Sequence, residues 1–196
     1  YGQRLSVSYD GSNRVDYITD PSGHYFRYTY LSSGDNTGKL DYIRAFVSSG
    51  TSDADQIARI EFTYKASSGS HADCGSTGDL IRVAVRTHKT GETSDTFSIN
   101  SYRHYRYYSG TFNADTNPGH PHELHYQLQP QHYDQAVTAL GNPLTASNAD
   151  LVFSAHYSFG FAYDSSNRCI NESVTIGGGG GCGGCGAKFS ASACCR

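Results

Sequence analysis

Short runs of alternating apolar and polar residues dominate the first third of the chain. They cover residues 5–9, 14–19, 24–30, 39–47 and 59–64. Alternation with a period of two is typical of half-buried β-strands, because successive side chains of a strand point to opposite faces of the sheet. The pattern therefore predicts a series of short strands in this part of the chain.

A turn signal separates the second of these runs from the third. Asp20, Pro21 and Gly23 occupy the first, second and fourth positions of a four-residue turn, where a type I turn favours these residue types. We expect a tight hairpin here, which joins Tyr17 and Ile18 to the strand that follows.

The strand pattern resumes in the middle of the chain. Residues 80–87 alternate so that one face is apolar, and strands are also predicted at 96–99, 102–108 and 157–163. Residues 111–130 are rich in Asn, Pro, Gly and His, which predicts a long loop. We therefore expect a second group of strands that a long loop interrupts.

Helical patterns are confined to residues 131–156. Candidate helices lie at 131–140 and 148–156, and in the first of them apolar residues recur at helical spacing. Gly141 follows at the place where a helix C-cap would stand. We expect one or two short helices as an insert in an otherwise all-β chain.

The composition agrees with an all-β fold. The chain has 16 Tyr, 9 Phe and 22 Gly, no Met and no Trp, and only 17% charged residues. Tyr and Phe suit a pleated, half-buried surface, whereas Gly supplies turns. We expect one β unit over residues 1–176 and a Gly- and Cys-rich tail over 177–196, which has too much Gly to bury a core of its own. Because the chain lacks Met and opens within a repeat, we expect it to be part of a longer product.

The charge pattern narrows the choice of partners. The net charge is -3, and no block of basic residues occurs. We therefore expect neither nucleic acid nor an anionic membrane as a partner. No apolar run approaches the ~18 residues that a membrane-spanning helix needs, so no membrane span is expected.

The cysteines indicate an oxidising compartment. Their number, six, is even, and four of them lie in the last fifteen residues. In a strand-rich chain an even number favours disulfides, with the pairing left open. A zinc site of four thiolates and a redox pair are the alternatives for the tail. We expect disulfides and an extracellular or cell-surface location. The candidate residues are Cys74, Cys169, Cys182, Cys185, Cys194 and Cys195.

One heptapeptide occurs near both ends of the chain. Residues 9–15 read YDGSNRV and residues 163–169 read YDSSNRC, so five of seven positions are identical. A weaker copy at 38–43 matches 13–18. Repetition at this scale indicates stacked supersecondary units. The motif residues are Tyr9, Asp10, Asn13, Arg14, Asp20, Pro21, Gly23, Tyr163, Asp164, Asn167 and Arg168.

This motif resembles the YD repeat of bacterial Rhs proteins and of teneurins. The resemblance covers residues 4–64 and 157–176, and it rests on Tyr-Asp, a turn, Arg-Val, Ile-Thr-Asp-Pro-Ser-Gly and Tyr-x-Tyr. The run at 102–108 and the Cys-Gly-Gly-Cys tail are similar to those of long secreted bacterial YD-repeat proteins. The resemblance implies an antiparallel sheet that spirals as each hairpin adds to one ribbon, which closes into a shell in better-known relatives. The chain carries few such units and no recognisable self-cleaving core region or C-terminal toxin.

Histidines gather in one part of the chain. His120, His122 and His125, with His132 nearby, are candidate ligands for zinc or copper. No HExxH motif is present, because Tyr126 stands where the second His would. A polar loop explains these histidines more simply, so we expect no bound metal and no cofactor.

The aromatic run at 102–108 is a candidate ligand surface for carbohydrate or single-stranded nucleic acid. Ordinary strand alternation explains it more simply, with one face packed and the other showing a ladder of aromatic and basic side chains. Asn171 begins an N-glycosylation sequon. The ladder residues are Tyr102, Arg103, Tyr105, Arg106 and Tyr107.

These patterns favour a structural function over a catalytic one. No nucleophile motif such as GxSxG is present, so we do not expect an enzyme. A short open sheet leaves an edge at each end, near 5–9 and 174–176, and unprotected edges pair with neighbouring chains. We expect an extracellular scaffold protein that self-associates head to tail into a fibre or surface structure. The alternative is a glycan- or partner-binding module of a larger secreted or toxin-delivery protein.

Overall fold

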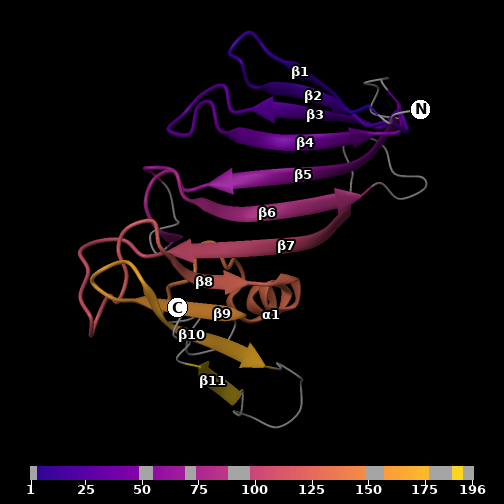
Figure 1. Ribbon diagram of the computed structural model, residues 1–196. Coiled ribbons are helices and arrows are strands. Elements are labelled where there is room, and N and C mark those ends of the chain that lie inside the picture. The colour runs from indigo at the N-terminus through magenta and orange to yellow at the C-terminus, as the bar shows by residue number, and fades with distance from the viewer. Residues whose placement is uncertain are drawn as a thin grey trace. The chain divides into compact units, whose positions relative to one another are not determined.

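A series of mostly antiparallel strands makes up most of the chain (Figure 1). Within the described residues, eleven strands are hydrogen-bonded to one another in their order along the sequence, and one α-helix accompanies them. The predicted all-β class is therefore confirmed. The computed structural model describes residues 4–48, 55–68, 74–87, 98–148, 157–176 and 187–191.

The elements have the following bounds: β1 (Ser6–Tyr9), β2 (Val15–Thr19), β3 (Tyr25–Tyr30), β4 (Leu40–Phe46), β5 (Gln56–Tyr64), β6 (Leu80–Thr87), β7 (Ser98–Tyr107), β8 (Leu124–Leu128), α1 (Pro130–Leu140), β9 (Phe159–Tyr163), β10 (Cys169–Ile176) and β11 (Ala187–Ala191). Contacts divide the chain into two compact units, where the sequence predicts one. Unit 1 comprises Tyr1–Thr63 and Val83–Ser101, and unit 2 comprises Tyr64–Arg82 and Tyr102–Arg196.

Two further predictions need correction. The interval 111–130 is not one long loop, because β8 occupies its last part. The alternation of Leu124, Tyr126 and Leu128 is only five residues long and lies between nearby prolines, so the sequence did not separate it from the loop. The tail beyond residue 176 is not wholly irregular either, since β11 pairs with β10.

The helix predicted at 131–140 is confirmed as α1. The second candidate helix, 148–156, lies outside the described residues apart from its first residue. α1 has eleven residues, whereas a bilayer crossing needs about 20. No helix in the described ranges has the length and apolarity to cross a membrane.

The same hydrogen-bonded closure ends six of the hairpins. The residue that follows the first strand donates its N–H to the carbonyl of the residue that precedes the second strand, over 2.8–3.0 Å. The residue that precedes this acceptor residue donates its own N–H to the carbonyl of the residue that follows the first strand, over 2.8–3.3 Å. It has a positive φ. The six pairs of first residue and positive-φ residue are Asp10 with Asn13, Asp20 with Gly23, Leu31 with Gly38, Lys65 with Gly78, Tyr108 with His122, and Asp164 with Asn167.

The positive φ explains which residue types occupy the turn. Left-handed backbone is costly for most L-residues, and Gly, Asn and His tolerate it best. The loop inside the closure varies in length, so the sequence repeat is visible only where the loop is short. The two YD strings are two copies of this closure, and they occupy equivalent places in the hairpins β1–β2 and β9–β10.

An aspartate strengthens the three shortest closures. The Oδ1 atom of Asp10 accepts the N–H groups of Ser12 and Arg14 at 2.8 and 2.9 Å, and its Oδ2 atom pairs with the Arg14 guanidinium. Asp164 makes the same contacts, and Asp20 makes them with His24 in place of the arginine. These hydrogen bonds favour the charged form and lower the pKa of all three carboxyls. The predicted hairpin at Asp20 is thereby confirmed.

Five of the closures share one further feature, and four of these five share a second. A tyrosine ends the first strand in each: Tyr9, Tyr30, Tyr64, Tyr107 and Tyr163. Four of the second strands carry a bulge, at which the ladder skips one residue. The skipped residues are Asp16, Asp41, His125 and Ile170. The hairpins β1–β2, β3–β4, β5–β6, β7–β8 and β9–β10 are therefore copies of one structural repeat.

The repeated tyrosine links one hairpin to the next. The Tyr30 hydroxyl donates to the Val15 carbonyl at 2.8 Å, and the Tyr163 hydroxyl donates to the Leu124 carbonyl at 3.0 Å. In both cases the acceptor is the first residue of the second strand of the preceding hairpin. The Arg14 guanidinium also lies 4.2 Å from the centre of the Tyr30 ring. This position therefore favours Tyr, which supplies both a packing ring and a donor.

The register of unit 1 gives the two faces of its sheet different chemistry. One face carries an apolar row across β2 to β5, formed by Ile18, Phe26, Ala45 and Ala58. The other face carries the row Tyr17, Arg27, Arg44 and Arg59. The side chains of the apolar row are half-exposed rather than buried.

Unit 2 has a small core between β8 and α1. Leu128 and Ala136 are fully buried, Tyr133 and Tyr157 are nearly so, and Tyr102 stacks on Tyr133 at 4.7 Å between ring centroids. Full burial of a side chain such as Leu128 stabilises a fold by about 1.5–3 kcal/mol. This core therefore packs α1 against β8.

A buried arginine fixes the segment that follows α1. The side chain of Arg106 is fully buried, and its Nη2 atom donates to the carbonyls of Pro143 and Ala146. Its Nε atom donates to Nε2 of His104, whose Nδ1 atom donates to the Ile81 carbonyl. The network therefore requires a neutral His104 that carries its proton on Nδ1.

The link between successive hairpins can be tested with Tyr30→Phe. The variant keeps the ring and removes the donor to Val15, so we expect the free energy of unfolding to fall by about 1 kcal/mol. The matched control is Tyr28→Phe on the same strand, where no hydroxyl hydrogen bond is made to the described residues. Urea titration measures both, and equal stabilities of the two variants would show that the link contributes nothing.

Candidate functional site

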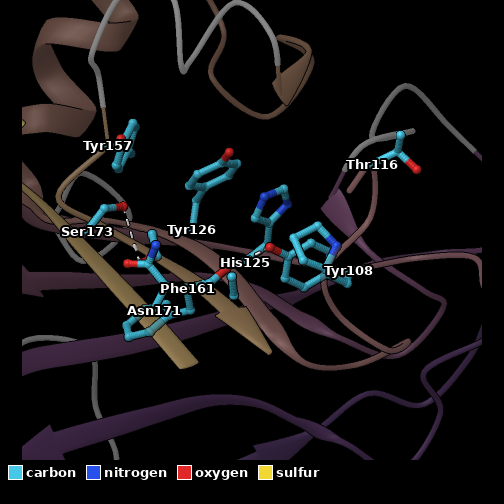
Figure 2. A pocket seen from close by; sticks show the side chains of 11 residues that line it. Tyr108, Thr116, His125, Tyr126, Tyr157, Phe161, Asn171 and Ser173 are labelled. Carbon is cyan, nitrogen blue, oxygen red and sulfur yellow. Dashed lines mark hydrogen bonds between the residues drawn. The ribbon is translucent and has the colours of Figure 1, made fainter. Parts of the chain in front are cut away.

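A groove of about 350 Å³ opens on unit 2 (Figure 2). β8, β9 and β10 supply most of its lining, and the rest comes from the β7–β8 loop and from Tyr157, which precedes β9. The lining residues are Tyr108, Thr116, Pro118, His125, Tyr126, Tyr157, Gly160, Phe161, Ala162, Asn171 and Ser173.

Four aromatic rings form a row along the groove (Figure 2). The His125 ring stacks on Tyr108 at 3.9 Å and on Tyr126 at 3.8 Å between centroids. The Tyr126 ring continues to Tyr157 at 5.0 Å. Because His125 is the skipped residue of the β8 bulge, its ring comes to lie beside that of Tyr126 rather than on the opposite face.

Two glycines allow these rings to approach the backbone. A Cβ at Gly160 would lie 2.6 Å from the Ser173 Oγ atom and 3.2 Å from the Tyr126 ring, and a Cβ at Gly119 would overlap the Tyr108 ring. Tyr108 is held further by its hydroxyl, which donates to the Phe161 carbonyl at 2.6 Å. The aromatic row is therefore a rigid feature of the groove.

Burial keeps the aromatic row uncharged at neutral pH. It lowers the pKa of His125 to about 4, with a smaller contribution from Arg106, and it raises the pKa of Tyr126 to about 12. Burial also raises the pKa of Tyr108. No Lys, Arg, Asp or Glu lies among the lining residues. The groove therefore suits a neutral ligand that stacks on rings and bonds to amide and hydroxyl groups.

In the structure, the histidines that were candidate metal ligands each contact a different partner. His120 stacks on Phe112 at 4.8 Å, and His122 pairs with Asp79 at 2.7 Å. His125 belongs to the aromatic row, and His132 is hydrogen-bonded to the Ser158 hydroxyl. In the described ranges no three metal-binding side chains converge. The positive φ of His122 reflects its place in a hairpin closure.

The predicted ladder on β7 is wrong as a single surface. Successive strand residues point to opposite faces, so Arg106 is buried and Tyr102 packs on α1. Arg103, Tyr105 and Tyr107 remain on the other face, and burial raises the pKa of Tyr107 to about 12. The sequence analysis placed all five residues in one ladder, although the alternation of the strand divides them between two faces.

The two described cysteines are not bonded to each other. The Cys74 side chain is buried and its thiol donates to the Leu144 carbonyl, and Cys169 is half-buried. Cys74 packs beside Ile81 and Leu144, and its place in a disulfide stays a prediction. The other candidates, Cys182, Cys185, Cys194 and Cys195, lie outside the described residues.

Asn171 is exposed on β10 and lies in the groove beside Ser173 (Figure 2). Its glycosylation stays a prediction. No sequence pattern predicts the groove, because its lining residues come from segments that only the strand register brings together. The pair Pro118-Gly119 and the isolated Gly160 in an aromatic strand are the signals that suggest a close approach.

No protein-family model matches this chain, and no curated protein matches it. The assignment of a function therefore rests on the geometry.

The stacked environment of His125 can be tested by its titration. Since its folded pKa of about 4 lies below the ordinary value of 6.5, the unfolded chain binds the proton first as the pH falls. We expect the stability of the protein to decrease as the pH is lowered from 6.5 towards 4, and His125→Phe to reduce that decrease. NMR titration of the imidazole gives the midpoint directly, and a midpoint near 6.5 would contradict the stacked arrangement.

Proposed function

We propose that this chain is an extracellular structural protein of the YD-repeat type that assembles head to tail through its terminal strands. The observation that carries the proposal is the open edge of β1. Elsewhere in the series, the hydroxyls of Tyr30 and Tyr163 join one hairpin to the preceding one. β1 is the first strand of the sheet order, and its outer edge has no neighbouring strand among the described residues.

The open edge lacks the usual protection. Leu5, Val7 and Tyr9 are 57%, 38% and 62% exposed, and neither Pro nor Lys occurs in β1. Protected edges normally carry charge, Pro or a bulge on the outer side, because unpaired backbone groups otherwise template pairing with another chain. The closure of the first hairpin is complete, so the strand is held ready for such pairing.

The repeated tyrosine indicates what kind of partner fits this edge. Tyr30 and Tyr163 each donate to the preceding hairpin, and Tyr9 holds the equivalent position in the first hairpin. A strand from a second copy of the chain would offer a backbone carbonyl to the Tyr9 hydroxyl, which makes no such hydrogen bond within the described residues. Contacts of this heterologous kind generate filaments when they do not close into a ring.

The other predicted edge needs correction. Val174, Thr175 and Ile176 are not at an edge, because they pair with Phe189, Lys188 and Ala187 of β11. The last strand of the sheet order is therefore β11, and it is the strand to which β1 of a second copy would add. The half-exposed apolar face of unit 1 also favours a protein that works in an assembly, since an isolated sheet normally covers one face.

A binding module is the second candidate function, and the neutral aromatic groove favours it. Stacked rings beside Asn171 and Ser173 match the needs of a neutral sugar, which offers a C–H face and hydroxyl groups. Binding of a neutral oligosaccharide that is lost in Tyr126→Ala, with assembly unchanged, would favour this candidate over the scaffold.

Assembly through β1 can be tested with Val7→Lys. A charge in the edge strand should prevent addition of a second sheet without disturbing the fold, so we expect monomers where the wild type forms larger species. The matched control is Ile170→Lys, which places the same charge at a 49% exposed apolar residue of an interior strand. Tyr9→Phe should weaken assembly about fivefold, the effect of one hydrogen bond of about 1 kcal/mol.

Multi-angle light scattering over a range of protein concentrations measures all four proteins. A wild type that stays monomeric at every concentration would rule out the proposal, as would assembly that Val7→Lys leaves intact. Thermal melting monitored by circular dichroism establishes that the variants are folded.

A further inference from the structure

Three arginines form a row on one face of unit 1. Arg27 on β3 lies opposite Arg44 on β4, and Arg44 lies opposite Arg59 on β5. Residues opposite each other project from the same face, and neighbouring strands are about 4.8 Å apart. Three guanidinium groups therefore follow one another across the sheet at strand spacing.

Such a row is unfavourable for the sheet alone. Like charges directly opposite each other destabilise a strand pair. The acidic groups that offset the row gather at its β5 end, where Glu61 pairs with Arg59 at 3.2 Å and with Arg86 at 2.9 Å. Asp41 lies near this end as well, and burial raises its pKa. Arg27 lies two strands away from Arg59 and makes no ion pair with the described residues.

Aromatic rings border the row and orient its guanidinium groups. Arg59 lies 4.3 Å from the centre of the Tyr42 ring, and Arg44 lies 5.5 Å from Tyr42 and 5.4 Å from Phe46. These contacts help to hold the guanidinium groups in place. The Nε atoms of Arg44 and Arg59 are buried, but Arg59 keeps 29% of its side-chain surface exposed, and Arg27 and Arg44 are half-buried. The face thus presents partly accessible guanidinium groups beside the Tyr42 ring.

We propose that this row is a binding site for an acidic polysaccharide, whose carboxylates pair with Arg27, Arg44 and Arg59. Arginine recognises carboxylates through two parallel hydrogen bonds, which a fixed guanidinium forms at low entropic cost. The half-buried ring of Tyr42 supplies an apolar surface against which the C–H face of a sugar ring packs. The proposal concerns unit 1 and is independent of assembly through β1.

The charge of the chain favours a sparsely charged polymer over nucleic acid. Duplex DNA carries one charge per about 1.7 Å of its axis, and its binding depends on a broad basic field. This chain has a net charge of -3, and acidic side chains border the row. A polymer with one carboxylate per sugar can contact the row without bringing many further charges near Glu61.

Isothermal titration of the full chain with an alginate oligomer tests the site. We expect binding that salt weakens, and a dissociation constant that rises about tenfold or more in Arg27→Gln and in Arg44→Gln, as expected for loss of a charge-assisted hydrogen bond. The control is Arg103→Gln, which removes the same charge from an exposed arginine of unit 2 and should leave binding unchanged. Neutral dextran should not bind.

Three results would overturn the proposal: no alginate binding by the wild type, equal weakening by Arg27→Gln and Arg103→Gln, or equally tight binding of a single-stranded DNA oligonucleotide that depends on the same arginines. Circular dichroism checks the fold of each variant. If Arg44→Gln fails to fold, Arg27→Gln decides the question, because Arg27 makes no described ion pair whose loss would unfold the sheet.

Discussion

The structure depends on one backbone constraint, the left-handed residue that closes each hairpin. In this closure two N–H···O=C hydrogen bonds fix where the second strand begins, and the positive φ turns the chain into it. Because a slip of one residue would move every side chain of a strand to the other face, the closure determines which residues share a face. Everything described for the two faces of unit 1 and for the groove of unit 2 follows from that register.

The closure also explains how a short sequence motif produces a continuing sheet. Two hairpins of the Tyr-ended series present a backbone carbonyl that the tyrosine of the next hairpin in the series reaches, as Tyr30 and Tyr163 show. A series built in this way has no internal signal that stops it. It ends where the chain leaves a strand without a neighbour, and β1 is such a strand among the described residues. The exposed side chains of Leu5 and Tyr9 are consistent with a surface that another hairpin covers.

Much of the fold could be predicted from local patterns. Alternation located most strands, the turn at Asp20 was recognisable, and apolar spacing located α1. β8 could not be recognised, because its alternation is only five residues long and directly follows a long loop. The closures at Gly38, Gly78 and His122 were only partly visible, since their loops differ in length and share little beyond a left-handed residue and a Leu two positions after it. The groove and the burial of Arg106 depend on pairing between distant segments, which no local pattern contains.

Hydrogen–deuterium exchange at several protein concentrations tests the central claim most directly, namely that β1 is an assembly edge. The amides of β1 that point away from β2 should exchange rapidly in dilute protein and become protected as the concentration rises, whereas the amides of β3, which already pairs on both sides, should not change. Exchange in β1 that is independent of concentration up to the solubility limit would contradict the account, because no second chain would then be adding to that edge.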